Sequence, residues 1–159
     1  MKLRKLEPKD AGLMLEWMHD PSVVSHLGTN FAEKTLDDCL GFISAAQNES
    51  QGIHLAIVDE TDTYMGTVSL KHPDGETAEF AITVRACAMG KGYAAWGMEE
   101  ILRHGLMDLG LKAIYWCVSP ENRRAIRFYD KNGYLRTEEV PQQIRCRYDI
   151  PLQWYVVTK

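Results

Sequence analysis

Residues 77–110 place a strand pattern, a glycine turn and a helix pattern directly one after another. Side chains alternate between apolar and polar from Thr77 to Arg85, and Gly90 and Gly92 follow. The helix pattern is an apolar stripe at roughly 3.6-residue spacing, made by Ala94, Met98, Ile101, Leu102, Gly105 and Leu109. Gly110 then stands where a helix C′ glycine belongs.

A glycine turn that leads into a helix exposes several backbone N–H groups without intrahelical partners. Because glycine has no Cβ, an anion can approach these groups closely, and the helix dipole favours negative charge there. The order strand, glycine turn, helix therefore predicts a phosphate-binding turn at residues 90–94. On these residues alone, a turn that needs glycine only for its positive φ is an equal alternative.

The other segments alternate between helix and strand patterns. Besides residues 77–85, strands are expected at residues 2–6, 53–58, 65–70, 112–118, 134–140 and 147–157, the last interrupted by Pro151 and so edge-like or bulged. Helices are expected after Pro8, after the cap pair Thr35 and Asp38, after Gly92, and from the Ser119-Pro120-Glu121 start to about Lys131. The stripe of the second helix would be Leu36, Cys39, Leu40 and Ile43. This order predicts a mixed sheet with helices on its faces, in the α/β to α+β range.

Length, charge and cysteine usage narrow the class of protein. The 159 residues suit one domain, residues 1–159, and a 45% apolar, 25% charged composition is typical of globular chains. The net charge of −4 argues against a nucleic-acid partner. The cysteines, Cys39, Cys87, Cys117 and Cys146, form no C-x-x-C pair, so no metal is expected. Without a secretory signal at residues 1–9 or an apolar run of about 20 residues, we expect a cytoplasmic protein with free thiols and no membrane partner.

Two motifs in this order resemble the GNAT superfamily of N-acetyltransferases. They are the glycine turn at residues 90–94 and N-R-R-A-I-R-F-Y-D-K-N-G-Y at residues 122–134. The segments W-M-H-D-P-S-V-V-S-H-L-G (17–28) and A-E-F-A-I-T-V (78–84) are similar to the branch with ribosomal-protein N-terminal and spermidine acetyltransferases. The resemblance covers nearly the whole chain in element order.

The resemblance implies a mostly antiparallel sheet of about seven strands with a V-shaped cleft between residues 77–85 and 112–118. Acetyl-CoA would lie in this cleft as co-substrate, with its pantetheine paired to the backbone of Ile82, Thr83 and Val84. Its pyrophosphate would rest on the backbone N–H groups of Gly90, Lys91, Gly92, Tyr93 and Ala94. The family has Gln or Arg three residues before its central glycine, where this chain has Met89. One side-chain contact to phosphate would then be missing, and Lys91 could partly replace it.

Acetyl transfer needs a neutral amine, a stabilised oxyanion and a proton for the leaving thiolate. Tyr129 matches the general-acid tyrosine of the family, with a core tyrosine as the alternative. Asn122 matches the position that binds the pantetheine or an ordered water, with a helix cap as the alternative. Glu79 is the leading candidate for the base, directly or through a water, against an exposed glutamate on a half-solvated face. His26 is the second candidate because its intrinsic pKa suits a base.

The acceptor pocket is expected from residues 22–31, the start of the second helix and residues 142–146. Asp37 and Asp38 could attract a cationic amine there, or simply favour the helix start. We expect direct transfer to a protein N-terminus or a small-molecule amine. An acetyl-cysteine route through Cys87 or Cys117 is disfavoured because neither has a histidine–acid pair in sequence reach.

Two other classes of protein compete with the enzyme. A non-catalytic acyl-CoA-binding module would keep the cleft without turnover, but Tyr129, Asn122 and Glu79 argue against it. A P-loop protein is excluded because no Lys-Ser/Thr pair follows the glycine turn. The C-terminal strands are a candidate interface for a homodimer.

Overall fold

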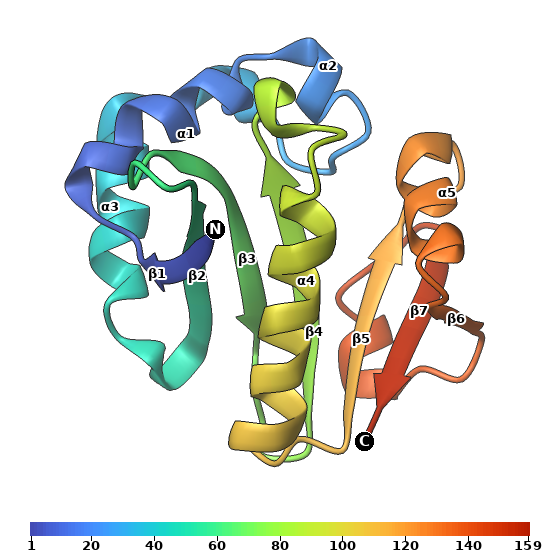
Figure 1. The fold of residues 1–159 in the computed structure, drawn as a ribbon. Coiled ribbons are helices and arrows are strands. Elements are labelled where there is room, and N and C mark those ends of the chain that lie inside the picture. Colours follow the sequence, from blue (N-terminus) through green and yellow to red (C-terminus); the bar gives the residue numbers. More distant parts are fainter.

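The computed structural model describes residues 1–159, and one seven-stranded sheet forms its centre (Figure 1). The strand order is β1-β2-β3-β4-β5-β7-β6. The bounds are Lys2–Lys5 (β1), Gly52–Val58 (β2), Tyr64–Lys71 (β3), Thr77–Val84 (β4), Ala113–Val118 (β5), Leu135–Thr137 (β6) and Gln153–Thr158 (β7). All neighbouring strands are antiparallel except β4 and β5, which are parallel. The expected mixed, mostly antiparallel sheet is confirmed.

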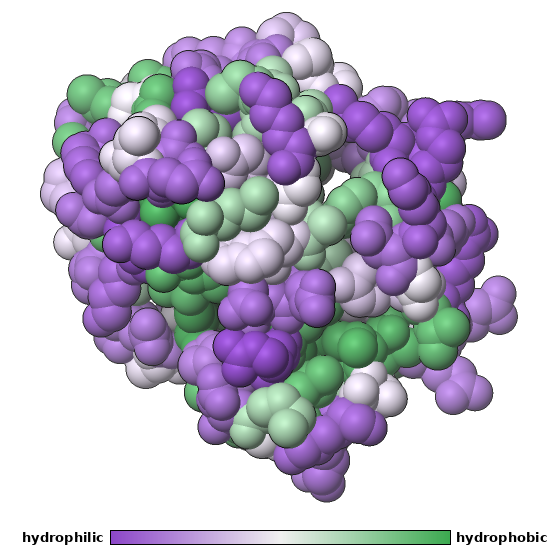
Figure 2. All heavy atoms as spheres, viewed as in Figure 1, coloured by the Kyte–Doolittle hydropathy of each residue, from purple (hydrophilic) through white to green (hydrophobic).

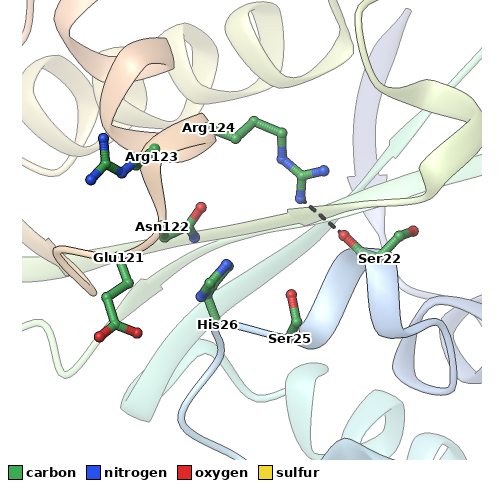
Figure 3. Close-up of a pocket in the computed structure, with 7 residues that line it drawn as sticks. All are labelled: Ser22, Ser25, His26, Glu121, Asn122, Arg123 and Arg124. Carbon is green, nitrogen blue, oxygen red and sulfur yellow. Dashed lines mark hydrogen bonds between the residues drawn. The ribbon is translucent and has the colours of Figure 1, made fainter.

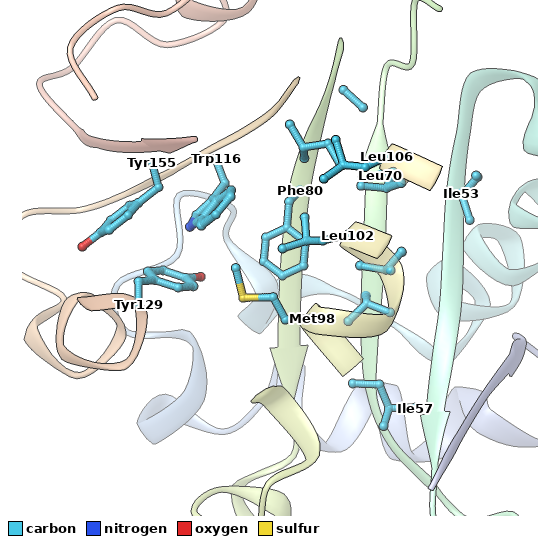
Figure 4. Close-up of a cluster of buried hydrophobic side chains, with 14 of the residues drawn as sticks. Ile53, Ile57, Leu70, Phe80, Met98, Leu102, Leu106, Trp116, Tyr129 and Tyr155 are labelled. Carbon is cyan, nitrogen blue, oxygen red and sulfur yellow. The ribbon is translucent and has the colours of Figure 1, made fainter. Parts of the chain in front are cut away.

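Helices cover both faces of this sheet. α1 (Ala11–Met18) and α3 (Leu36–Ala46) pack on one face, over β2 and β3, in a cluster of 12 buried residues. α4 (Tyr93–Arg103) and α5 (Arg123–Lys131) lie on the other face, in a cluster of 18 buried residues that includes Met98, Trp116 and Tyr129 (Figure 4). None of the helices is long and apolar enough to cross a membrane.

Two glycines allow α4 to lie close to the sheet. A Cβ on Gly97 would come within 2.5 Å of the Ile57 Cδ1 atom, and one on Gly105 within 2.8 Å of the Ile114 Cδ1 atom. Gly105 lies in a π-helical turn, His104–Asp108, that extends α4. This turn changes the helix phase, so Leu109, expected on the buried stripe, is 43% exposed.

The buried face of α3 is narrower than its sequence pattern predicted. Cys39, Ile43 and Ala46 are buried, whereas Leu36 and Leu40 are 48% and 37% exposed. The expected cap is confirmed, because Thr35 and Asp38 form a reciprocal capping box. A short helix, α2 (Pro21–Val24), lies before α3, where no helix was expected.

The predicted start of α5 was wrong by several residues. The helix begins at Arg123, and its N-cap is Asn122, whose Oδ1 accepts a hydrogen bond from the Ala125 N–H at 3.3 Å. Ser119 Oγ instead accepts from the Glu121 N–H, two residues on, which makes a local turn before the helix.

The C-terminal strands are also shorter than predicted. Of the strand predicted at residues 134–140, only Leu135–Thr137 forms a strand, β6. The strand predicted at 147–157 begins at Gln153, after Pro151, because the proline ring fixes φ and removes a backbone donor. The segment before it contains a short helix, α6 (Gln142–Arg145). β7 is not an edge strand, because it lies between β5 and β6.

Candidate active site

The parallel strands β4 and β5 pair along only part of their length. Three residue pairs join them, from Thr77 with Ala113 to Glu79 with Tyr115. Beyond Glu79 the strands separate, as Figure 1 shows, and the surface is hollowed between α4 and α5 in the same view (Figure 2). The expected V-shaped cleft is therefore present in the sheet.

The three residues expected to hold the pantetheine lie beyond that last pair. Ile82, Thr83 and Val84 pair with β3 along one edge of β4 and have no strand partner along the other. A strand edge without a partner presents N–H and C=O groups that an extended ligand can use.

The glycine turn has the geometry predicted from the sequence. Gly90 and Gly92 have φ of 75° and 88°, and Gly92 is the N-cap of α4. The backbone N–H groups of residues 90–95 make no hydrogen bond of good geometry within the chain. Tyr93 and Ala94 open the helix, so its dipole adds to the attraction for an anion. These residues fit a pyrophosphate.

The two side chains next to this turn differ in what they offer. Met89 packs against both hydrophobic clusters, so its side chain supports the turn from inside. Lys91 is exposed and forms no ion pair, which leaves its ammonium free for a phosphate.

Tyr129 lies on α5 among aromatic rings at the floor of the cleft. It is 8% exposed, and its ring centroid is 5.5 Å from that of Trp116 and 5.1 Å from that of Tyr155. Figure 4 shows its hydroxyl directed toward Met98 and Phe80, across the separation of β5 and β4. Burial raises the pKa of Tyr129, so the phenol keeps its proton at neutral pH.

The polar atoms of this aromatic cluster are not all satisfied. Trp116 Nε1 is the only enclosed side-chain donor or acceptor of the chain without a hydrogen-bond partner. The Tyr129 hydroxyl has no hydrogen-bond partner in the chain either, but its oxygen is not completely buried and can be reached from the cleft. A proton donor that reaches the cleft and is not tied to another group suits a general acid.

Asn122 lines an open pocket of about 230 Å³ between α2 and the start of α5 (Figure 3). The other lining residues are Ser22, Ser25, His26, Glu121, Arg123 and Arg124. Arg124 spans the pocket and donates to the Ser22 carbonyl at 3.3 Å. The side-chain oxygen of Asn122 caps α5, and its amide NH₂, which has no partner in the chain, remains for a ligand or water.

Glu79 is placed differently from the exposed glutamate considered from the sequence. It is 2% exposed, and its Oε1 is paired with the Arg147 guanidinium. Its Oε2 accepts a hydrogen bond from the Tyr148 hydroxyl at 2.6 Å. Both carboxylate oxygens of Glu79 therefore have partners within the chain, and the base role stays a prediction.

The remaining candidates are dispersed. His26 is exposed in the Asn122 pocket, and Asp37 and Asp38 are exposed in the first turn of α3. Cys87 is exposed and Cys117 is half-buried on β5, where burial raises the pKa of its thiol to about 11. All four cysteines are free, as expected.

The sequence missed the partners of Glu79. Arg147 and Tyr148 were assigned to a strand, where their side chains would have pointed to opposite faces. Their positions follow from the chain path between α6 and β7, and no local pattern in the sequence marks that path.

The comparisons with known proteins agree with this geometry. The model of a family described as acetyltransferase (GNAT) domain matches residues 1–135. The chain is 30% identical over 149 residues to uncharacterized N-acetyltransferase p20 of Bacillus licheniformis, covering 87% of this chain and 84% of that protein.

Solved structures share the fold at low sequence identity. A spermidine N-acetyltransferase from Vibrio cholerae in complex with CoA and spermine has a TM-score of 0.81 at 19% identity, covering 99% of this chain and 94% of that one. A GNAT-family acetyltransferase from Bacillus anthracis has a TM-score of 0.75 at 21% identity, covering 98% and 93%. The chain therefore belongs to the GNAT family and is an acetyl-CoA-dependent N-acetyltransferase.

Proposed function

We propose that this protein transfers the acetyl group of acetyl-CoA to a primary amine by direct attack within the β4–β5 cleft. The observation that carries the proposal is the unpaired edge of β4 at Ile82–Val84, which leads into the free N–H groups of residues 90–95. The first fits an extended pantetheine and the second a pyrophosphate. Tyr129 on α5 and Asn122 at the N-cap of that helix would face the bound acetyl-CoA.

In the proposed step, the nitrogen of the neutral amine attacks the thioester carbonyl carbon. The C–S bond then breaks, and the sulfur of CoA takes the proton of the Tyr129 phenol. The attacking nitrogen loses its proton to a base or to water, and solvent returns a proton to Tyr129. A protonated phenol beside the leaving sulfur lowers the barrier because the thiolate need not leave as a free anion.

The cysteines support direct attack over a covalent route. Burial raises the pKa of Cys117 to about 11, so its nucleophilic thiolate is scarce at neutral pH. Cys117 also has no histidine among its hydrogen-bond partners, and an activated nucleophile needs such a base.

The Asn122 pocket does not select the acceptor. It carries Arg123 and Arg124, neither in an ion pair, against the single carboxylate of Glu121. Because Asn122 belongs to the α4–α5 side, where acetyl-CoA is expected, these charges do not decide which amine binds. We therefore propose the primary amine of a peptide N-terminus or of a small molecule as the acceptor.

Thermal unfolding with and without acetyl-CoA, with ATP as control, tests the cofactor site. Acetyl-CoA at about 100 times its Kd should add roughly 2.7 kcal/mol to the free energy of unfolding. A panel of peptides, amino sugars and polyamines, followed by release of free CoA thiol, then identifies the acceptor. Stabilisation by acetyl-CoA without thiol release from any amine would instead support a non-catalytic acyl-CoA-binding module. No stabilisation at all would contradict both.

A further inference from the structure

Residues 142–150, from α6 to the approach of β7, form a segment whose ion pair and side-chain hydrogen bond with the sheet both go to Glu79. Ile144 is buried, whereas Cys146 and Ile150 are exposed. The ties are the Arg147–Glu79 ion pair and the Tyr148–Glu79 hydrogen bond. Tyr148 also packs edge-on against Trp154 of β7, with ring centroids 5.3 Å apart. We call residues 142–150 the clasp segment.

The tie lies at the closed end of the cleft. Glu79 is the last residue of β4 that pairs with β5, and the residues expected to hold the pantetheine begin three positions later. Its neighbour Phe80 belongs to the core under α4. Because side chains alternate along a strand, Glu79 points to the opposite face, and the clasp segment covers that face.

The opposite face is the side from which an amine can reach the thioester. The glycine turn at the start of α4, Asn122 and Tyr129 all belong to the α4–α5 side, so a bound acetyl-CoA would occupy that side. The acceptor then has to approach from the side that the clasp segment covers.

We propose that Glu79 is a positioning residue whose carboxylate fixes the clasp segment as one wall of the acceptor site. The inference rests on the proposed acetyl transfer and deepens it, because it assigns the wall that contacts the amine substrate. Glu79, Arg147 and Tyr148 then act as one unit, in which Arg147 and Tyr148 connect the strand to the clasp.

Because the Glu79 carboxylate is buried, its contacts with Arg147 and Tyr148 matter more than an exposed ion pair would. Glu79 is 2% exposed and has lost its hydration, so its partners in the chain replace the water contacts of its oxygens. Arg147, with a side chain 34% exposed, brings the compensating charge from the clasp. Removing either charge should therefore loosen the clasp, which would then keep only the buried Ile144 side chain and the Tyr148–Trp154 packing.

The rate of trypsin cleavage after Arg145 measures how often the clasp segment opens, and it needs no acetyl-transfer substrate. Arg145 lies inside the clasp and makes no contact with Glu79, so the cleavage site is present in every variant. Glu79→Gln and Arg147→Gln should each accelerate this cleavage by about tenfold, because cleavage follows the population of the opened segment. Glu76→Gln is the matched control, since its pair with Lys112 is exposed.

Steady-state kinetics then connect the clasp to the acceptor. Both variants should raise the acceptor KM by about tenfold, and their double variant should be no worse than either alone, because the residues act as a unit. Stabilisation by acetyl-CoA and the acidic limb of the pH–rate profile should remain as in the wild type. Tyr148→Phe, which removes one hydrogen bond and leaves the charges, provides a milder variant if the others fail to fold.

Two results would overturn the proposal. Unchanged trypsin rates in Glu79→Gln and Tyr148→Phe would show that Glu79 does not hold the clasp. Loss of turnover and of the acidic limb in Glu79→Gln, with wild-type behaviour in Arg147→Gln, would make Glu79 the base. If the wild-type protein acetylates no amine, the proposed function fails by itself, and the trypsin rates alone then decide whether Glu79 holds the segment.

Discussion

Glu79 on β4 and Tyr115 on β5 face each other at the last position where these two strands pair. One residue further along, the two strands have separated, and β5 continues to pair with β7 alone as far as Val118. The cleft is therefore part of the sheet and does not require an opening motion. A site that exists before binding costs little reorganisation, so the acetyl-CoA contacts can be tested one at a time.

Replacing Gly92 with aspartate should abolish acetyl-CoA binding. The substitution adds a side chain and a negative charge where the pyrophosphate is expected, and the two anions repel each other. The thermal stabilisation by acetyl-CoA, roughly 2.7 kcal/mol at 100 times the wild-type Kd, should disappear.

Gly75→Asp is the matched control for this variant. Gly75 has φ of 92° and no atom within 4 Å of an added Cβ, so the backbone strain is similar but the site lies in the turn before β4. Full stabilisation by acetyl-CoA in Gly92→Asp would mean that the phosphates bind elsewhere.

Tyr129→Phe should lower kcat on the order of a hundredfold with little change in acetyl-CoA affinity. The lost hydroxyl has no partner in the chain, so its removal leaves no unsatisfied group and the free energy of unfolding should hardly change. Tyr134→Phe is the control, because Tyr134 also packs on Trp116, at 5.3 Å. Single-turnover rates of acetyl transfer make the comparison. Equal rates in Tyr129→Phe and wild type would remove Tyr129 from the mechanism.

Gly97 on α4 and Gly12 on α1 should respond to alanine substitution in opposite ways. Gly97→Ala should cost about 1–3 kcal/mol of unfolding free energy, because its Cβ would come within 2.5 Å of Ile57. Gly12→Ala, on α1 with nothing within 4 Å, should stabilise by about 0.5–1 kcal/mol through helix propensity. Chemical denaturation of both variants measures the two values. A neutral Gly97→Ala would mean that Ile57 repacks freely.

The sequence predicts most of the fold because its signals are local. Thr35 with Asp38 marks the start of α3, and alternation of apolar and polar side chains marks β4. Predictions failed at particular elements. The π-helical turn at His104–Asp108 moved Leu109 outward, and the strand expected at 147–157 begins only at Gln153.

The predictions for the candidate site also divide into local features, which the sequence indicates, and long-range contacts, which it does not. The glycine turn and the cleft strand are backbone features of contiguous segments, and the sequence indicates them directly. The environment of Glu79 is different, since its partners Arg147 and Tyr148 lie 68 and 69 residues away along the chain. Strand alternation predicts that Glu79 leaves the α4 face, but only the folded chain shows which side chains meet it there.

His54 should make the stability of the protein fall below about pH 6.5. It lies on β2, half-buried, with Nδ1 2.7 Å from Ser69 Oγ and the Phe42 ring edge-on at 4.9 Å. Burial, assisted by Lys71, lowers the pKa of His54 below its ordinary value of 6.5. As pH falls, the unfolded chain therefore takes up this proton before the folded chain does, and the stability that His54 contributes above pH 6.5 is lost.

Thermal unfolding between pH 5 and 8 measures how steeply stability falls with pH. His54→Gln should reduce this slope, and its amide can still reach Ser69. His26→Gln, at an exposed position, is the control. The same slope in His54→Gln and wild type would mean that other groups account for the loss of stability in acid.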